Sequence, residues 1–150
     1  MVSYVFKKFD ELTNIELYEI VKLRLIVFIF GRNIKEVDLD DKDYDKGTYH
    51  LMGYLDGELI SYLRILPAGC NYKNISIGRV AVIKEYRRKG LRKEIMQEAI
   101  KRIKALCPND IIEISAQSYV KNLYLDLGFI QTSDEYIEVD IPHIHMIYNK

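Results

Sequence analysis

The chain has 150 residues, 49% of them hydrophobic, which is the length of one ordinary domain and enough apolar content for a buried core. Its 22 basic and 22 acidic residues balance, which argues against a protein that coats nucleic acid. The two cysteines lack the spacing of a zinc site or a disulfide framework, and no apolar run approaches the roughly 20 residues that span a bilayer. We therefore expect a single domain over residues 1–150, in the cytoplasm, with no membrane or nucleic-acid partner.

A helix is expected near the N-terminus, because Thr13 and Glu16 have the spacing of a capping box. Gly31 would end this helix after about residue 30. The residues expected near its buried face are Ile15, Tyr18, Leu25 and Phe28. The acidic segment 38–45 is typical of a loop. It lies in solvent or attracts a cationic acceptor such as an amine, and it lacks the glycine and glutamate that an EF-hand needs.

Two strand-like runs, 48–55 and 58–66, flank Asp56-Gly57, which is a strong signal for a two-residue hairpin turn. A third long strand is expected at 75–83. Three consecutive strands of this kind indicate a largely antiparallel first half of the fold.

The second half is expected to alternate helices and strands. A helix should begin after Gly90, end near Cys107-Pro108 and bury one face, formed by Leu91, Ile95, Ala99 and Ile103. The remaining elements are expected in this order: a strand at 111–115, a helix at 119–127 closed by Gly128, and strands at 129–131 and 144–148. The complete order predicts a mixed α/β fold.

Residues 80–92 carry the most informative pattern: a short β-branched run, a basic turn with Gly90, and the start of a helix. The first N–H groups of a helix have no partner inside it, and the helix dipole adds about half a positive charge there. Eleven Lys or Arg residues stand between Lys73 and Lys104, against three Glu. We therefore expect a site for a phosphate or a pyrophosphate. The alternative is a solvated, basic helix start.

The segment 87–92, Arg-Arg-Lys-Gly-Leu-Arg, resembles the pyrophosphate loop of the GNAT acyltransferases, (Gln/Arg)-x-x-Gly-x-(Gly/Ala). Val-Ala-Val at 80–82 resembles the strand that precedes it. Arg92 departs from the loop pattern, so its side chain must point away from the phosphate or join the phosphate contacts.

This resemblance implies a site for acetyl-CoA. The backbone of 80–82 would pair with the pantetheine arm, the Val82 N–H would polarise the acetyl carbonyl, and the N–H groups of 88–92 would hold the pyrophosphate. The cofactor-binding residues that it implies are Val80, Ala81, Val82, Arg87, Arg88, Lys89, Gly90, Leu91, Arg92, Asn122 and Tyr124.

A second resemblance to the same family runs from Ala116-Gln117 through Asn122 and Tyr124 to Gly128-Phe129. In that family a tyrosine four residues before Gly-Phe commonly lies beside the sulfur of coenzyme A. A phenol with a pKa of about 10 stays protonated at pH 7 and can donate a proton to a leaving thiolate. The resemblance thus implies that Tyr124 is the general acid. The alternative is an ordinary core tyrosine, since the chain has 12.

From about residue 9 to residue 146 the chain resembles the ElaA-like branch of the GNAT family. The resemblance rests on Leu23-Arg24, Val27-Phe28, Arg64-Ile65-Leu66, Ile77-Gly78-Arg79-Val80, Ala116-Gln117 and Ile141-Pro142-His143-Ile144. It departs at Gly31-Arg32, where that branch tends to have Glu-Gln. The implied fold is an α/β (α+β) GNAT-like fold, with a mixed, mostly antiparallel sheet of six to seven strands flanked by about four helices.

Two residues are candidates for the base that takes a proton from the acceptor: Glu113, at the end of a short strand, and His143. His143 and His145 are two apart on an expected strand and would face the same side. A metal site needs a third ligand, and none is evident, so we expect no metal. A packed or surface histidine is the alternative reading of both.

The expected activity is an N-acetyltransferase that moves an acetyl group from acetyl-CoA to an amine by direct transfer in a ternary complex, with Tyr124, His143 and Glu113 as catalytic residues. The acceptor would be a small molecule or a peptide amine, and a homodimer is possible because dimers are frequent in similar proteins. The alternative is a non-catalytic sensor or interaction module that binds coenzyme A or a nucleotide on the same fold.

Overall fold

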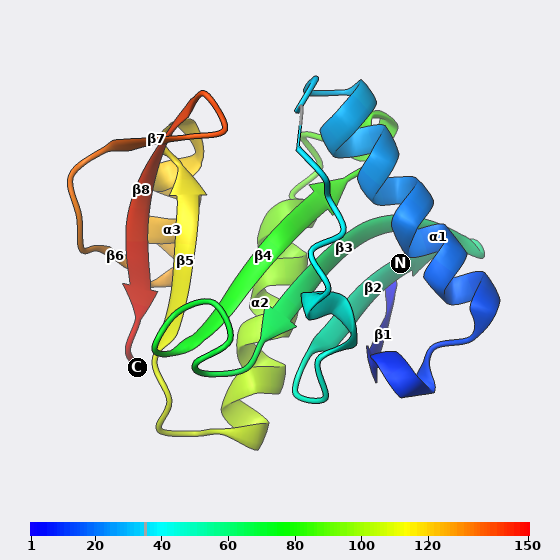
Figure 1. Cartoon of the computed structure of the whole chain (residues 1–150), viewed down its shortest axis with the longest axis horizontal. Coiled ribbons are helices and arrows are strands. Elements are labelled where there is room, and N and C mark those ends of the chain that lie inside the picture. The colour runs from blue at the N-terminus through cyan, green and yellow to red at the C-terminus, as the bar shows by residue number, and fades with distance from the viewer. Residues whose placement is uncertain (35) are drawn as a thin grey trace.

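The computed structural model describes residues 1–34 and 36–150. They form one eight-stranded sheet in the order β1-β2-β3-β4-β5-β8-β6, with β7 also paired to β8 (Figure 1). The strands are β1 (Ser3–Lys8), β2 (Tyr49–Leu55), β3 (Glu58–Leu66), β4 (Ile75–Val82), β5 (Ile112–Gln117), β6 (Ile130–Gln131), β7 (Tyr136–Glu138) and β8 (Ile141–Tyr148). The α-helices are α1 (Asn14–Arg24), α2 (Leu91–Leu106) and α3 (Lys121–Leu127).

The helices cover opposite faces of the sheet. Helix α1 lies on the front face in Figure 1, and α2 and α3 lie behind the sheet. Each face has its own apolar core. Ile20, Leu23 and Val27 pack on Met52 and Tyr62 in front, whereas α2 and α3 pack behind against the larger core. The GNAT-like α/β fold expected from the sequence is confirmed by this architecture. The described residues contain eight strands and three α-helices, compared with the six to seven strands and about four helices expected.

The two halves of the sheet separate between β4 and β5. These strands are parallel and pair only at Ile75–Ile112 and Ser76–Glu113. Beyond that point β4 continues along β3 and β5 continues along β8, so a wedge opens on the sheet. Figure 1 shows β4 and β5 diverging from this junction.

Strand β4 carries a β-bulge next to the wedge. Its pairing with β3 passes from Ala81–Tyr62 to Gly78–Arg64, so two residues of β4 oppose one residue of β3. Arg79, within the bulge, has a φ of 53°, which is uncommon for a residue with a β-carbon. The bulge changes the direction of the strand at the edge of the wedge.

The first helix begins and ends where expected but buries a different face. Thr13 and Glu16 form the capping box, and the helix continues to Phe30. Its last six residues widen to π-helical turns, with the Gly31 N–H donating to the Ile26 carbonyl at 2.9 Å. The prediction that Ile15, Tyr18 and Leu25 are buried is wrong, since all three are exposed and Phe28 is half-buried. Apolar residues occur all round this helix, so their spacing does not select a face.

The other elements follow the sequence closely. Asp56 and Gly57, with φ angles of 50° and 81°, form the expected hairpin turn between β2 and β3. Helix α2 buries Ile95, Ala99 and Ile103 as predicted, whereas Leu91 is half-buried. Gly128 closes α3 with a φ of 107°. Strands β1 and β7 were not predicted. Among the described residues, no helix is both long enough and apolar enough to span a membrane.

Candidate acyl-transfer site

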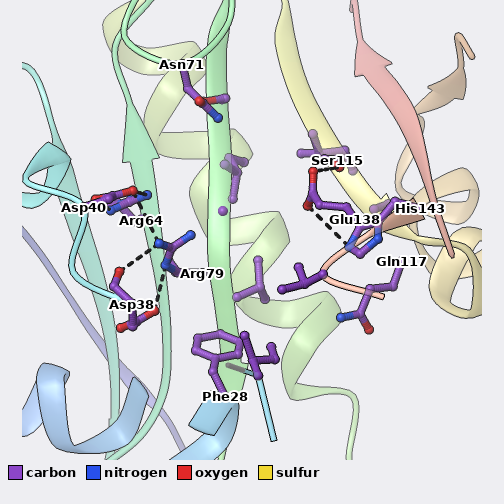
Figure 2. A pocket seen from close by; sticks show the side chains of 18 of the residues that line it. Phe28, Asp38, Asp40, Arg64, Asn71, Arg79, Ser115, Gln117, Glu138 and His143 are labelled. Carbon is purple, nitrogen blue, oxygen red and sulfur yellow. Dashed lines mark hydrogen bonds and ion pairs between the residues drawn. The ribbon is translucent and has the colours of Figure 1, made fainter. Parts of the chain in front are cut away.

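The wedge between β4 and β5 holds a cavity of about 470 Å³. One wall comes from β4 and from the segment that follows α1, and the other comes from β5, β7 and β8 (Figure 2). Arg32 and Arg92 line it, as do Ser76, near the junction of β4 and β5, and Arg79 on the bulge. We call the part with Arg32 and Arg92 the basic end and the part near Ser76 the closed end.

The basic end lies beside the loop that leads into α2. Gly90 has a φ of 77°, and the helix starts at the next residue. The first backbone hydrogen bond of α2 runs from the Glu94 N–H to the Gly90 carbonyl. The N–H groups of residues 91–93 therefore have no acceptor within the helix. Arg88 also has a positive φ, at 64°, and its side chain is exposed like that of Lys89. The loop therefore presents unused donors and positive charge.

Arg92 does not block this loop. Its side chain reaches from the first turn of α2 into the cavity, where Nη1 donates to the Tyr124 hydroxyl at 3.2 Å. Tyr124 is 4% exposed, and its ring packs edge-on against Phe129. The structure thus brings Arg92 and Tyr124 together. The guanidinium leaves the Tyr124 O–H proton available to a group in the cavity.

Arg32 is a basic residue that the sequence reasoning did not select for this site. It lines the cavity with Arg92. Burial lowers the pKa of its guanidinium, and the charges of Arg92 and Arg87 lower it further. Among residues 1–34 and 36–150, no carboxylate forms an ion pair with any of these three arginines. Three mutually repelling guanidinium groups indicate a place for an anion.

Val82 is the last residue of β4 and lies just beyond the part of the strand that lines the cavity, which ends at Val80. The Ile83 N–H donates to the Ile60 carbonyl at 2.9 Å, and hydrogen bonding alternates along an antiparallel ladder. The Val82 N–H therefore points away from β3, toward the wedge. Arg87 reaches the same backbone, with Nε donating to the Val82 carbonyl at 3.0 Å. Asn122 lies apart from this arrangement, on the exposed side of α3 and outside the cavity lining.

His143 lies in the wall opposite Arg79 (Figure 2). It is 5% exposed, and its Nδ1 is 2.7 Å from the Ile141 carbonyl, so Nδ1 is the protonated nitrogen of the neutral ring. Its Nε2 is 3.5 Å from Glu138, a carboxylate that the sequence reasoning missed. Glu138 also accepts a hydrogen bond from Ser115 at 3.3 Å. The acceptor atom of His143 therefore belongs to a small polar cluster.

Glu113 does not reach the cavity. Burial alone would raise the pKa of its carboxyl group, but hydrogen bonds with His145 and Asn74 outweigh burial and lower it. Asn74 donates to Oε1 from both its backbone and its side chain, and His145 Nε2 is 2.5 Å from Oε2. A carboxylate held in this way is a weak base. The structure also separates His145 from His143, because His145 is engaged with Glu113.

The acidic segment that follows α1 forms an ion-pair network along the cavity wall, and four of its members line the cavity: Asp38, Asp40, Arg64 and Arg79. Arg24 pairs with Asp38 and Asp43, each at 2.7 Å; Arg64 pairs with Asp40 at 2.7 Å and Asp43 at 3.1 Å; and Arg79 pairs with Asp38 at 2.9 Å and Asp40 at 3.3 Å. The expectation that this loop lies in solvent or attracts a cation is wrong for Asp38, Asp40 and Asp43, because arginines already neutralise these three carboxylates. Asp41 and Asp45 are exposed, as expected. The three arginines come from motifs that looked unrelated in sequence.

Comparison with known proteins agrees with this geometry. The family model of the acetyltransferase (GNAT) domain matches residues 32–150. Protein ElaA of Escherichia coli is 31% identical over 137 residues, which cover 91% of this chain and 90% of ElaA. The crystal structure of an acyl-CoA N-acyltransferase from Pseudomonas aeruginosa is 32% identical, with a TM-score of 0.93 and 99% coverage of both chains. An aminoglycoside 6'-N-acetyltransferase complexed with coenzyme A shares the fold, with a TM-score of 0.72, 10% identity and coverage of 97% of this chain and 96% of its own.

Proposed function

The chain belongs to the acetyltransferase (GNAT) family, and from this premise we propose that it is an N-acetyltransferase that uses acetyl-CoA and an amine acceptor. The observation that carries the proposal is a single cavity with uncompensated arginines at one end and a phenol, a histidine and a carboxylate along its walls. Acetyl-CoA supplies the acetyl thioester and leaves as the free thiol. The transfer would be direct, within a ternary complex of the protein with both substrates.

The basic end fits the phosphates of coenzyme A. The N–H groups of residues 88–92 would hold the pyrophosphate, with Arg88 and Lys89 adding charge. Arg32 and Arg92 would complete the site from the cavity side, and an anion there would relieve the repulsion that lowers the pKa of Arg32. Asn122 is exposed, so it would contact only a part of the cofactor that extends out of the cavity.

Three groups of this chain would perform the transfer. The Val82 N–H faces the wedge and would stabilise the negative charge that develops on the acetyl oxygen. His143 Nε2 would take a proton from the acceptor amine, because its Nδ1–H is fixed on the Ile141 carbonyl. The Tyr124 O–H would donate a proton to the leaving sulfur while Arg92 holds the phenol oxygen. Glu113 has no part in this scheme.

Calorimetric titration with acetyl-CoA, followed by an assay of thiol release over a panel of amines, tests the proposal. Binding together with amine-dependent release supports the enzyme. Binding without release from any amine would favour the alternative, a coenzyme A or nucleotide sensor on the same fold. The absence of both binding heat and a thermal shift would overturn the proposal and the sensor alternative together.

A further inference from the structure

Polar groups at the closed end of the cavity lack protein partners. Ser76 is 2% exposed and lines the cavity, yet its Oγ makes no hydrogen bond within the described part of the chain. Arg64 is 3% exposed and lines the same end, and its Nε is likewise unbonded there. A buried donor without a partner costs about 1–3 kcal/mol, so such groups mark a place where a ligand supplies the partner.

Arg79 adds a fixed donor to these groups. Asp38 lies against its Nε and Nη2, and Asp40 lies 3.3 Å from Nη2. Nη1 has no partner among residues 1–34 and 36–150, and Figure 2 shows one terminal nitrogen of Arg79 pointing away from the aspartates. Because the guanidinium is planar and its other edge is held, Nη1 is a preorganised donor on the cavity wall.

The opposite wall carries an accessible carboxylate. Glu138 has a side chain that is 46% exposed, and its nearest basic group within the described chain is His143 Nε2, at 3.5 Å. Figure 2 shows Glu138 and His143 across the wedge from Arg79. A positive group bound there would lie next to the atom proposed to remove its proton.

We infer that the acceptor is a small zwitterion, an amino acid or a close derivative, which carries a primary amine and a carboxylate on one molecule. The amine lies against Glu138 and His143, and the carboxylate accepts hydrogen bonds from Arg79 and Ser76 and from Arg64 Nε. This inference rests on the proposed function, and it extends that proposal by naming the substrate class.

Charge and hydrogen bonding both favour a zwitterion over other amines. In the ion-pair network along the cavity wall, three aspartates balance three arginines, so neither sign dominates this end. A diamine would place a cation beside Arg79 and leave the donors of Ser76 and Arg64 without partners. An amino sugar could accept hydrogen bonds from Ser76 and Arg64 through its hydroxyl groups. It carries no carboxylate, however, so it could not provide opposite charges for both Glu138 and Arg79.

The wild-type protein tests the inference with three matched sets of amines: amino acids, the same compounds as carboxamides, and their decarboxylated amines. A site that hydrogen-bonds a substrate group discriminates strongly against analogues that lack it. We therefore expect kcat/KM for the preferred amino acid to exceed that of its decarboxylated amine by at least about 100-fold. Equal values, turnover of diamines or amino sugars only, or no turnover of any amino acid would overturn the inference. Failure of acetyl-CoA to bind would instead overturn the proposed function.

Two variants locate the carboxylate. Arg79→Gln keeps a long side chain at the same backbone conformation, and Ser76→Ala removes only the unbonded hydroxyl. Each should raise KM for the amino acid about tenfold or more, with the Kd of acetyl-CoA unchanged. Ser61→Ala is the matched control, because Ser61 is 0% exposed with an unbonded Oγ but lies outside the cavity lining. An equal effect of Ser61→Ala and Ser76→Ala, or an unchanged KM in Ser76→Ala, would refute this placement even if Arg79→Gln fails to fold.

Discussion

Arg92 occupies a position where the GNAT loop pattern has a residue without a long side chain, and the structure turns this departure into a contact with Tyr124. Nη1 donates to the phenol oxygen, so Arg92 orients the proposed acid and contributes positive charge to the basic end. The backbone N–H of Arg92 stays in the first turn of α2, where it has no helical acceptor. One residue therefore serves two parts of the cavity.

Replacement of Tyr124 by Phe tests the acid. The ring would keep its contact with Phe129, while the proton donor would be lost. We expect kcat to fall about 100-fold or more and the Kd of acetyl-CoA to stay within about twofold. Steady-state thiol release and calorimetry measure the two values. Tyr148→Phe is the control, since Tyr148 also packs on Phe129 but lies outside the cavity lining. Unchanged turnover in Tyr124→Phe would contradict the assignment.

Glu113 and His143 should separate cleanly in an experiment. Glu113→Gln removes a carboxylate that holds Asn74 and His145, so we expect it to lower the free energy of unfolding by about 1–3 kcal/mol and to leave kcat unchanged. His143→Gln should lower kcat about 100-fold instead. Urea unfolding and the thiol assay give both quantities. A large loss of kcat in Glu113→Gln, with stability unchanged, would restore Glu113 as the base.

At the scale of single residues, the sequence identified two residues of the cavity lining better than it identified the partners of the candidate residues. Tyr124 and His143 both line the cavity, as their motifs implied. Glu138 was missed because it lies in a short strand without a motif, and it meets His143 only through the pairing of β7 with β8. Glu113 lies outside the cavity lining and is held by Asn74 and His145, and this could not be predicted because both partners are distant from it in sequence.

The segment that follows α1 is held by ion pairs rather than by an apolar core. Arg24 is 1% exposed and joins α1 to Asp38 and Asp43. Burial would raise the pKa of the Asp43 carboxyl, but the hydrogen bond from Arg24 and the charges of Arg24 and Arg64 lower it below its ordinary value. Removing one partner of such a buried pair leaves an uncompensated charge.

This arrangement makes stability depend on pH in a defined direction. Because the pKa of Asp43 is lower in the folded protein than in the unfolded chain, its contribution is complete above about pH 5 and is lost progressively as the pH falls below about 4, toward the lower pKa of the folded protein. Asp43→Asn should therefore lower the free energy of unfolding by about 3–5 kcal/mol at pH 7 and by less at pH 3.5. Urea unfolding at several pH values measures this. Asp126→Asn, at an exposed site on α3, should keep the wild-type dependence of the free energy of unfolding on pH. The same dependence in Asp43→Asn would contradict the argument.

Elements whose apolar residues follow one clear period were predictable from the sequence. Elements whose buried side or pairing depends on tertiary contacts were not. Helix α2 has a single apolar face, and three of its five buried residues, Ile95, Ala99 and Ile103, were named from the sequence. Helix α1 has apolar residues on all sides, and the charged pairing of Arg24 decides which side turns inward. Strand β1 is half-buried along its length and begins near the N-terminus, so its pairing with β2 left little trace in the residue pattern.

Across the whole molecule, the cavity is divided by charge although the chain has no net charge. Arg24, Arg64 and Arg79 are neutralised by aspartates beside the closed end. The arginines at the basic end have no such partners in the described part of the chain. A sequence shows how many charges a chain has, but not which ones the fold neutralises. The separation of the cavity into a neutralised end and a basic end is therefore a property of the folded structure that the sequence alone does not show.

The division predicts that acetyl-CoA binding depends strongly on salt despite the zero net charge. Arg32 is the sharpest probe, because it lies outside the phosphate loop and repels Arg87 and Arg92 when no anion is present. Arg32→Ala should raise the Kd of acetyl-CoA about tenfold at low ionic strength, which corresponds to one charge-assisted hydrogen bond. The difference in the Kd of acetyl-CoA between Arg32→Ala and the wild-type protein should become smaller as salt screens the remaining charges.

Two comparisons make this prediction specific to the phosphates. A short acetyl thioester without phosphates, S-acetyl-N-acetylcysteamine, should show the same kcat/KM with wild type and Arg32→Ala, because it cannot reach the basic end. Arg102→Ala should leave the Kd of acetyl-CoA unchanged, since Arg102 lies further along α2 and pairs with Glu98. If Arg32→Ala weakened the short thioester as much as acetyl-CoA, Arg32 would act on the reacting groups or on folding. The basic end would then be no phosphate site, and the uneven distribution of charge in this neutral chain would need another explanation.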